Sequence, residues 1–260
     1  VQFYDRFYKH GKAVIFMAGK FPKNMQSLMN KYIGALQLNQ KALPTYDHPI
    51  ISAVTKKYSI VNDASSVQGS IRMARRFPNR HHPDFPGTQV LNNVFGGFFG
   101  SRLMRNIRED KGYTYGARSR FGASKDYGTY KFSSEIKKEA TDSAIKELMF
   151  EITNFKANGI TQEELDFTKS SITLSAALDY ETPFDKLNFL SSIAENNLPK
   201  DYTVQQAAMI KGMSIADINA VAKAQLKPEK TVIIVVGHAY KIRDGLNNLG
   251  YGKIKEITVD

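Results

Sequence analysis

The sequence predicts an α+β fold, a two-layer sandwich in which helices pack on one face of a mainly antiparallel sheet. Segments that alternate between apolar and polar residues are concentrated in the first half of the chain, before residue 140. From there to residue 226, apolar residues recur with helical spacing. With 42% hydrophobic and 23% charged residues, the chain has the composition of a globular protein that can bury a sizeable core.

The first predicted elements are strands and one short helix. Ala13–Gly19 is an apolar run closed by glycine, which predicts a strand. Pro22 then opens a helix, and its apolar stripe consists of Met25, Leu28, Met29, Tyr32 and Ile33. Tyr58–Val61 and Val67–Arg75 are the next predicted strands. In the second of these, apolar and polar residues alternate, so one face should be buried and the other should meet solvent.

A hairpin and a long helical region follow. After a buried helix that begins at Val90, two alternating runs, Tyr115–Phe121 and Gly128–Glu135, predict two strands joined by a tight connection. The region Thr161–Leu226 is predicted to be helical, with interruptions at Pro183 and Pro199. Thr161-Gln162-Glu163-Glu164 has the pattern of a capping box that opens a helix, and Ser214-Ile215-Ala216-Asp217 resembles a second one. Thr231–Gly237 is predicted to be the final core strand.

Length and composition limit the possible number of domains and the kinds of site that the chain can contain. At 260 residues we expect one domain over residues 1–260, and because the chain opens at Val1 without Met we expect it to be a segment of a longer protein. No apolar run reaches the roughly 18–20 residues that span a bilayer. The absence of cysteine excludes disulfides, thiolate metal sites and a Cys nucleophile. It leaves the compartment open.

The net charge of +11 is unevenly distributed. Between Lys56 and Arg120 there are twelve Lys or Arg residues and only four Asp or Glu residues. A solvated basic face, attraction of an acidic or carboxylate-ended peptide, and binding of nucleic acid all remain open at this point.

No set of hydrolytic residues is present. The five histidines include no His-x-x-Glu-His or Glu-His-x-x-His spacing, so no helix presents two imidazoles one turn apart beside a general base. His81 and His82 sit in a predicted surface loop, and His238 follows a buried strand. There is also no Gly-x-Ser-x-Gly turn for a nucleophilic serine. We therefore predict no metal ligand in this chain.

The segment from residue 95 to 115 is the most informative part of the sequence. It reads as a glycine break, a short helix, a turn at Gly112 and the start of a strand, which should bring Arg108 and Tyr115 to neighbouring positions. A guanidinium can hold backbone carbonyls or a carboxylate, and a phenol can donate a hydrogen bond to a polarised carbonyl. The alternative is structural: Arg108 would cap a helix C-terminus and Tyr115 would be a half-buried strand residue.

Three glycines precede this pair. Gly96, Gly97 and Gly100 are predicted to let backbones approach closely beside Arg108 and Tyr115, and we include them in the predicted substrate-binding set.

Several segments together resemble the second domain of the pitrilysin/insulinase zinc peptidases, the superfamily that includes mitochondrial processing peptidase. The resemblance rests on Ser101-Arg102-Leu103, Ile107-Arg108-Glu109, Gly112-Tyr113-Thr114-Tyr115-Gly116, Asn158–Leu165 with Lys169, and the opening from Phe7-Tyr8 to Gly19. These segments extend over nearly the whole chain, and their combination is much more specific than any one of them.

The resemblance implies a clamshell of two similar halves around a chamber. In this family one half carries an inverted zinc motif, His-x-x-Glu-His, and the other carries an Arg and a Tyr that contact substrate. By motif position these two residues match Arg108 and Tyr115, whereas the zinc motif is missing from this chain. The resemblance also implies that substrate binds by adding a strand to a sheet edge.

Our leading hypothesis is therefore the substrate-binding half of a zinc metalloendopeptidase, inactive alone, with Zn²⁺ and its ligands in a partner half. The alternative is a catalytically inactive structural or binding homologue of the same fold. Nucleic acid is not the expected partner, because Arg72, Arg75, Arg76 and Arg80 are divided between a strand and a loop and no known nucleic-acid module is present.

Overall fold

The computed structural model describes residues 1–9, 13–35, 57–178 and 180–258. Residue contacts group the chain into two compact units. The smaller unit comprises residues 1–51 and 176–195, and the larger comprises residues 52–175 and 196–260. Each unit is described by itself below. The assignment of all 260 residues to one family domain stays a prediction.

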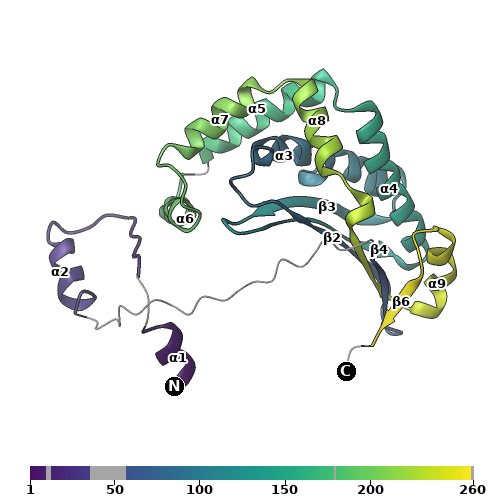
Figure 1. Cartoon of the computed structure of the whole chain (residues 1–260), viewed down its shortest axis with the longest axis horizontal. Coiled ribbons are helices and arrows are strands. Elements are labelled where there is room, and N and C mark those ends of the chain that lie inside the picture. Colours follow the sequence, from purple (N-terminus) through teal and green to yellow (C-terminus); the bar gives the residue numbers. More distant parts are fainter. Residues whose placement is uncertain (10–12, 36–56, 179, 259–260) are drawn as a thin grey trace. The chain divides into compact units, whose positions relative to one another are not determined.

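The larger unit is built on a six-stranded sheet (Figure 1). Its strands are β1 (Lys57–Asn62), β2 (Gln68–Phe77), β3 (Thr114–Ala123), β4 (Gly128–Lys137), β5 (Val232–Gly237) and β6 (Ile254–Ile257). They lie in the order β3-β4-β2-β5-β1-β6. The pairs β3–β4, β4–β2 and β2–β5 are antiparallel, and the pairs β5–β1 and β1–β6 are parallel. The predicted, mainly antiparallel sheet is confirmed.

Helices cover one face of this sheet, as predicted. Figure 1 shows α3, α4 and α8 over the same side of the strands. The helices that lie wholly or mainly in this unit are α3 (Phe85–Asn92), η1 (Asn93–Gly97), η2 (Met104–Asp110), η3 (Lys138–Ala140), α4 (Thr141–Asn158), α5 (Gln162–Leu178), α7 (Tyr202–Gly212), α8 (Ile215–Gln225), η4 (Pro228–Lys230) and α9 (Ala239–Asn248). Of these, η1 and η2 are π-helical and η3 and η4 are 3₁₀ turns. No described helix is long and apolar enough to cross a membrane.

The core lies between the sheet and the helices, and strand alternation produces it. In β2 every second residue, from Gly69 to Phe77, is buried, and the residues between them point away from the helices. Phe132 and Tyr130 of β4 and Ile233 and Val235 of β5 are buried on the same side. The helices contribute Leu91, Phe95, Leu148, Ile152, Phe155, Ile218 and Leu246 to this core.

Predicted helix starts are also confirmed. Ser214 and Asp217 form a capping box at the start of α8, since each side chain bonds the other residue's backbone N–H. Thr161 and Glu164 make the same reciprocal pair at the start of α5. A cap of this kind satisfies N–H groups that have no partner within the helix.

Strand β3 is an edge strand whose middle is capped from the side. It is last in the strand order and pairs only with β4. The N–H of Ala117 points to Sδ of Met104 at 3.2 Å, and the carbonyl of Ser119 accepts from the Asn92 side-chain amide at 3.0 Å. The Ser119 hydroxyl also donates to Oδ1 of Asn92. The segment α3-η1-η2 therefore lies along this edge of the sheet.

Two predictions about strands are wrong. Residues Ala13–Gly19 are not in a strand: among the described residues they join no ladder, and Val14, Ile15 and Met17 are exposed. An apolar run becomes a strand only where a neighbouring strand accepts its backbone hydrogen bonds. Thr231–Gly237 is not the last strand of the core, because the sheet continues through β6, which pairs in parallel with β1.

The smaller unit is helical in its described part. It contains α1 (Gln2–Phe7), α2 (Met25–Tyr32) and α6 (Pro183–Glu195), and none of these helices has a buried residue. The helix that begins after Pro22 was predicted and is confirmed as α2. Pro183, predicted as an interruption, is the first residue of α6, where proline is tolerated.

The packing of η1 against β3 leads to a stability prediction. An added Cβ at Gly96 would lie 2.5 Å from Oγ of Ser119, 2.8 Å from Cδ1 of Leu103 and 3.0 Å from the backbone N of Ser119. We expect Gly96→Ala to lower the free energy of unfolding by about 1–3 kcal/mol, because overpacking forces these groups apart. Urea denaturation measures this change.

Gly122→Ala is the matched control. A Cβ at Gly122 in the same strand β3 would meet nothing within 4 Å. Alanine is also the better strand residue, so stability should be unchanged or slightly higher. Equal destabilisation by both substitutions would contradict the proposed close packing at Gly96.

Candidate functional site

Arg108 and Tyr115 lie on either side of a turn between η2 and β3. Gly112 has φ +62°, a left-handed conformation that glycine adopts without strain. The turn is closed by two backbone hydrogen bonds, from Gly112 N–H to the Arg108 carbonyl at 3.1 Å and from Tyr113 N–H to the Ile107 carbonyl at 3.0 Å. The predicted sequence of short helix, glycine turn and strand is thus present.

Tyr115 projects from an irregular start of the edge strand. The β3–β4 register shifts between Thr114 and Ala117, which is a bulge. The hydroxyl of Thr114 stabilises it by accepting from the Gly116 N–H at 3.0 Å and from the Ser134 hydroxyl at 3.0 Å. At this bulge the Tyr115 side chain is 87% exposed. Its hydroxyl bonds no other described residue.

Arg108 has an aromatic partner and no anionic one. Its guanidinium carbon lies 4.3 Å from the ring centroid of Phe99, a cation–π arrangement. Among the residues that the structure describes, Arg108 makes no ion pair. Phe99 is itself 58% exposed. Stacking leaves the guanidinium N–H groups in the plane of the fork available to a ligand.

The structural alternative is wrong for Tyr115, whereas Arg108 does lie in the last turn of η2, where a cation suits a helix C-terminus. Tyr115 is not half-buried, and the side chain of Arg108 makes no hydrogen bond to the carbonyls at the end of η2 in the described structure. Tyr115 is presented to solvent at the start of β3, and Arg108 is partly exposed at the end of η2. Their contact with a substrate stays a prediction.

The three glycines of the predicted set differ in their surroundings. Gly96 is buried, and the close approach it allows is to Ser119 and Leu103 of the protein itself. Gly97 is exposed but close to Asn92, and Gly100 lies beside the ring of Phe98. Their part in substrate binding stays a prediction, and only Gly100 lines a cavity described next.

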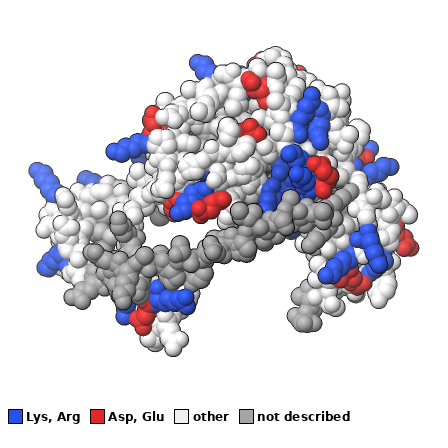
Figure 2. All heavy atoms as spheres, in the orientation of Figure 1, with Lys and Arg blue, Asp and Glu red and all other residues white. Residues whose placement is uncertain are grey.

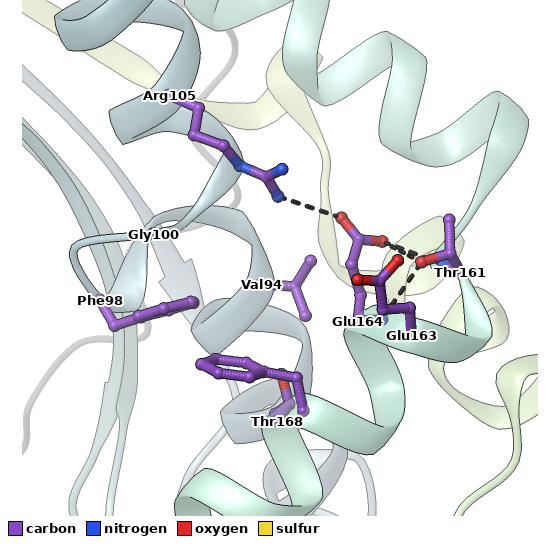
Figure 3. Close-up of a pocket in the computed structure, with 9 residues that line it drawn as sticks. Val94, Phe98, Gly100, Arg105, Thr161, Glu163, Glu164 and Thr168 are labelled. Atoms are coloured by element: carbon purple, nitrogen blue, oxygen red, sulfur yellow. Dashed lines mark hydrogen bonds and ion pairs between the residues drawn. The ribbon is translucent and has the colours of Figure 1, made fainter.

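A partly apolar pocket near this segment was not predicted. It has a volume of about 530 Å³ and is lined by Val94, Phe98, Gly100, Arg105, Thr161, Glu163, Glu164, Phe167 and Thr168 (Figure 3). The rings of Phe98 and Phe167 stack with centroids 5.3 Å apart. Because Phe167 is 69 positions beyond Phe98 in the chain, no local sequence pattern could indicate their contact.

A charged network forms the polar wall of this pocket. Arg102 donates to both carboxylate oxygens of Glu164, at 2.8 and 2.6 Å, and to the Gly159 carbonyl at 2.8 Å. Figure 3 shows Arg105 reaching toward the same carboxylate, with a separation of 3.7 Å. The Arg102 and Glu164 side chains are only 14% and 17% exposed. This pair fixes the start of α5 against the loop after Phe98.

Burial opposes the ionisation of Glu164, but hydrogen bonds from Arg102 and Thr161 outweigh it and lower its pKa from the usual 4.5. A lowered pKa in the folded state means that the charged carboxylate stabilises the fold. That contribution is present above the unfolded-state pKa and is lost as the pH falls through the folded-state pKa.

The described residues do not form a metal centre. No three His, Asp or Glu side chains in the described part of the chain come together in a group that could hold a metal ion. Nδ1 of His82 accepts a hydrogen bond from the Asp84 backbone N–H at 3.1 Å, so His82 stabilises the loop before α3. The side chains present therefore do not fit Zn²⁺.

Comparisons with known proteins bear on this site. The family described as "Peptidase M16 inactive domain" matches residues 1–172. The chain is 26% identical over 199 residues to "Non-peptidase homolog YmxG" of Helicobacter pylori, which covers 75% of this chain and 46% of that protein. It is 22% identical over 178 residues to "Probable inactive metalloprotease YmfF" of Bacillus subtilis, covering 68% and 41%.

A solved structure is similar in both sequence and fold. The crystal structure of a peptidase M16 inactive domain from Pseudomonas fluorescens superimposes with a TM-score of 0.71 at 25% identity, covering 84% of this chain and 52% of that one. A protease structure from Helicobacter pylori has a TM-score of 0.77 at 18% identity, covering 84% and 54%, and supports the fold alone. The chain spans about half the length of these relatives.

The network at Glu164 leads to a pH prediction. We expect Glu164→Gln to lower the free energy of unfolding at pH 7 by about 2–3 kcal/mol, because it leaves a largely buried Arg102 unpaired. The difference from the unmodified chain should shrink as the pH falls below the usual carboxyl pKa of 4.5, because the unfolded state then takes up a proton that the folded carboxylate resists. Urea denaturation across this pH range measures it.

The neighbouring Glu163→Gln is the control for this experiment. Glu163 is exposed and makes no ion pair with another described residue, so its neutralisation should change stability by less than about 0.5 kcal/mol at any pH. A deficit of Glu164→Gln that stays constant from pH 7 to pH 3 would contradict the role of the charged carboxylate.

Proposed function

Because this chain belongs to the peptidase M16 inactive domain family, we propose that it is a non-hydrolytic half that holds an extended peptide with Arg108 and Tyr115. A second half completes the assembly, since the relatives are about twice as long as this chain. The names of two relatives, a non-peptidase homologue and a probable inactive metalloprotease, support an inactive role.

The observation that carries this proposal is an exposed tyrosine and a partly exposed arginine on either side of the turn that leads into an edge strand. Tyr115 is 87% exposed at a bulge, and Arg108 faces no carboxylate among the described residues. A tyrosine and an arginine presented this way are typical of contact surfaces, where both are enriched. Tyr115 makes no contact that buries it, and the contact of Arg108 with Phe99 leaves its N–H groups available.

The edge of β3 limits how a peptide can bind here. The N–H of Ala117 and the carbonyl of Ser119 are already bonded to Met104 and Asn92. An added strand therefore cannot pair along the middle of β3. This favours binding of the peptide by side chains at the bulge. Addition of the peptide as a strand would then occur at another sheet edge of the assembly.

The chemistry of the two side chains suits a peptide backbone. The guanidinium of Arg108 is permanently charged and offers several donors, so it can bind a main-chain carbonyl or a C-terminal carboxylate. The Tyr115 hydroxyl can donate to a second carbonyl. Because neither group depends on a particular substrate side chain, such a site would read the backbone more than the sequence.

A second candidate is the substrate-binding half of an active zinc peptidase. It is supported by relatives named "uncharacterized zinc protease" in Bacillus subtilis and Mycobacterium tuberculosis. A partner half would then have to supply the Zn²⁺, which in such enzymes polarises the scissile carbonyl and its attacking water. In that setting one donor such as the Tyr115 hydroxyl is typically worth about 10²–10³ in rate.

Peptide binding tests the first proposal. The chain, with any partner half that copurifies, is titrated into a fluorescein-labelled extended peptide and anisotropy is recorded. We expect Tyr115→Phe to weaken binding about threefold to tenfold, through loss of one hydrogen bond. Arg108→Ala should weaken it by roughly tenfold or more, through loss of a charged donor.

Two substitutions far from the site serve as controls. Tyr240→Phe changes an exposed tyrosine on α9, and Arg243→Ala removes an arginine that pairs with Glu256 on the surface. Both should bind peptide as the unmodified chain does. If Arg108→Ala and Tyr115→Phe also bind normally, the site assignment is wrong.

Hydrolysis separates the two candidates. The assembly is incubated with a fluorogenic peptide, with zinc and with a chelator. No cleavage with retained binding supports the non-hydrolytic half. Zinc-dependent cleavage that falls strongly with Tyr115→Phe supports the second candidate instead.

A further inference from the structure

In the described part of the larger unit no helix covers the second face of the sheet (Figure 1), and the strand register shows which residues lie on that face. In β2 the residues that point away from the helices are the even-numbered ones, such as Arg72. Ser133 of β4 pairs with Arg72, and Arg118 of β3 pairs with Ser133, so these three residues lie in one row on that face. The next row contains Arg120 and Lys131.

This face of β2, β3 and β4, which we call the open face, is strongly cationic. Its basic residues are Arg72, Arg76, Arg118, Arg120, Lys131 and Lys137. Its acidic residue is Glu135, which forms an ion pair with Arg72 at 2.5 Å and so neutralises it. Figure 2 shows Lys and Arg atoms gathered over the region where Figure 1 places β2 and β3.

Two of these cations oppose each other across the strands. Arg120 and Lys131 are direct partners in the β3–β4 register, and both are exposed. Like charges directly opposite in a sheet destabilise the pair. Arg118, Arg120 and Lys131 form no ion pair with any described residue. The fold therefore carries an electrostatic repulsion that an anionic ligand would relieve.

An apolar strip borders the cations. Val232, Ile234 and Val236 of β5 are half-buried and lie on the same face, with Ile234 beside Arg72 in the register. The open face thus combines unpaired positive charge with a strip that can contact aliphatic side chains.

We propose that the open face binds acidic, extended polypeptide, so that the peptide held at Arg108 and Tyr115 is selected for Asp and Glu residues. This inference rests on the proposed peptide-holding function and names its substrate class. Side chains on one side of an extended peptide are about 7 Å apart, so alternate carboxylates can follow the basic rows from β3 to β2. Charge complementarity of this kind sets specificity and association rate.

The composition of the open face favours a polypeptide over nucleic acid. Proteins that bind single strands on a sheet stack bases on exposed aromatic residues. Here the strand aromatics Phe77, Phe121, Tyr130 and Phe132 point into the core and are buried. Tyr115, at the strand edge, is the exposed aromatic of β2, β3 and β4 as described, and one ring gives no row of stacking sites.

Competition between labelled peptides tests this proposal. The assembly is titrated with three fluorescein-labelled extended twelve-residue peptides, one rich in Glu, one neutral and one rich in Lys. We expect the acidic peptide to bind at least about tenfold more tightly than the neutral one at low salt, and this preference to fall as salt is raised.

A charge-reversal variant connects the preference to the open face. Arg118→Glu, Arg120→Glu and Lys131→Glu together should weaken binding of the acidic peptide by roughly tenfold or more, because three attractive contacts become repulsive. The same variant should bind the neutral peptide unchanged. The matched control is Lys146→Glu, Lys211→Glu and Lys223→Glu, which changes the net charge equally on exposed helix positions.

The outcomes are distinguishable. If no peptide of any charge binds, the proposed function itself fails. If all three peptides bind alike, or if both triple variants weaken acidic binding equally, peptide holding stands and the acidic preference is refuted. Tighter binding of a single-stranded oligonucleotide than of the acidic peptide, lost in the open-face variant, would assign this face to nucleic acid instead. Circular dichroism of each variant shows whether it folds.

Discussion

The contact between the α3-η1-η2 segment and the edge strand β3 is the constraint on which the rest of the site depends. Gly96 allows η1 to approach the backbone of Ser119, and Asn92 bonds both polar groups of that residue. Met104 covers the next outward N–H, that of Ala117. An unpaired edge is a common cause of aggregation. The contacts from Asn92 and Met104 satisfy polar groups in the middle of this edge, whereas the bulged start of β3 presents Tyr115 to solvent.

The sheet has two faces with opposite physical roles. The residues of β2 that face the helices are buried with a large aromatic and aliphatic core, which supplies the main driving force for folding. The residues on the open face contribute little to that burial and instead concentrate positive charge, including the opposed Arg120 and Lys131. Because Glu135 neutralises only Arg72, the arrangement is better explained by binding than by stability. On the proposal above, the same strands serve folding on one side and recognition on the other.

Much of this could be predicted from local patterns, and what could not depends on distant contacts. The alternation of apolar and polar residues in β2, β3 and β4 predicts these strands. The capping pairs at Thr161 and Ser214 predict two helix starts. Both signals involve residues that are close in sequence. The stacking of Phe98 on Phe167 and the bridging of Glu164 by Arg102 join segments about 60 to 70 residues apart. No spacing rule indicates them. The run Ala13–Gly19 shows the opposite error, since apolar alternation indicates a strand but not the neighbour it needs.

The proposed separation of peptide binding from peptide hydrolysis agrees with the positions of the polar groups. A hydrolytic centre needs titratable groups close together in a site with perturbed pKa values. In the described structure Glu164 binds Arg102 and Asp217 caps Ser214, and hydrogen bonds lower the pKa of each carboxyl. A carboxylate already bound in this way is a poor general base. By contrast, Arg108 and Tyr115 keep their donors available. On the proposal above, these donors orient a peptide and polarise its carbonyl, whereas the groups that activate water belong to another half.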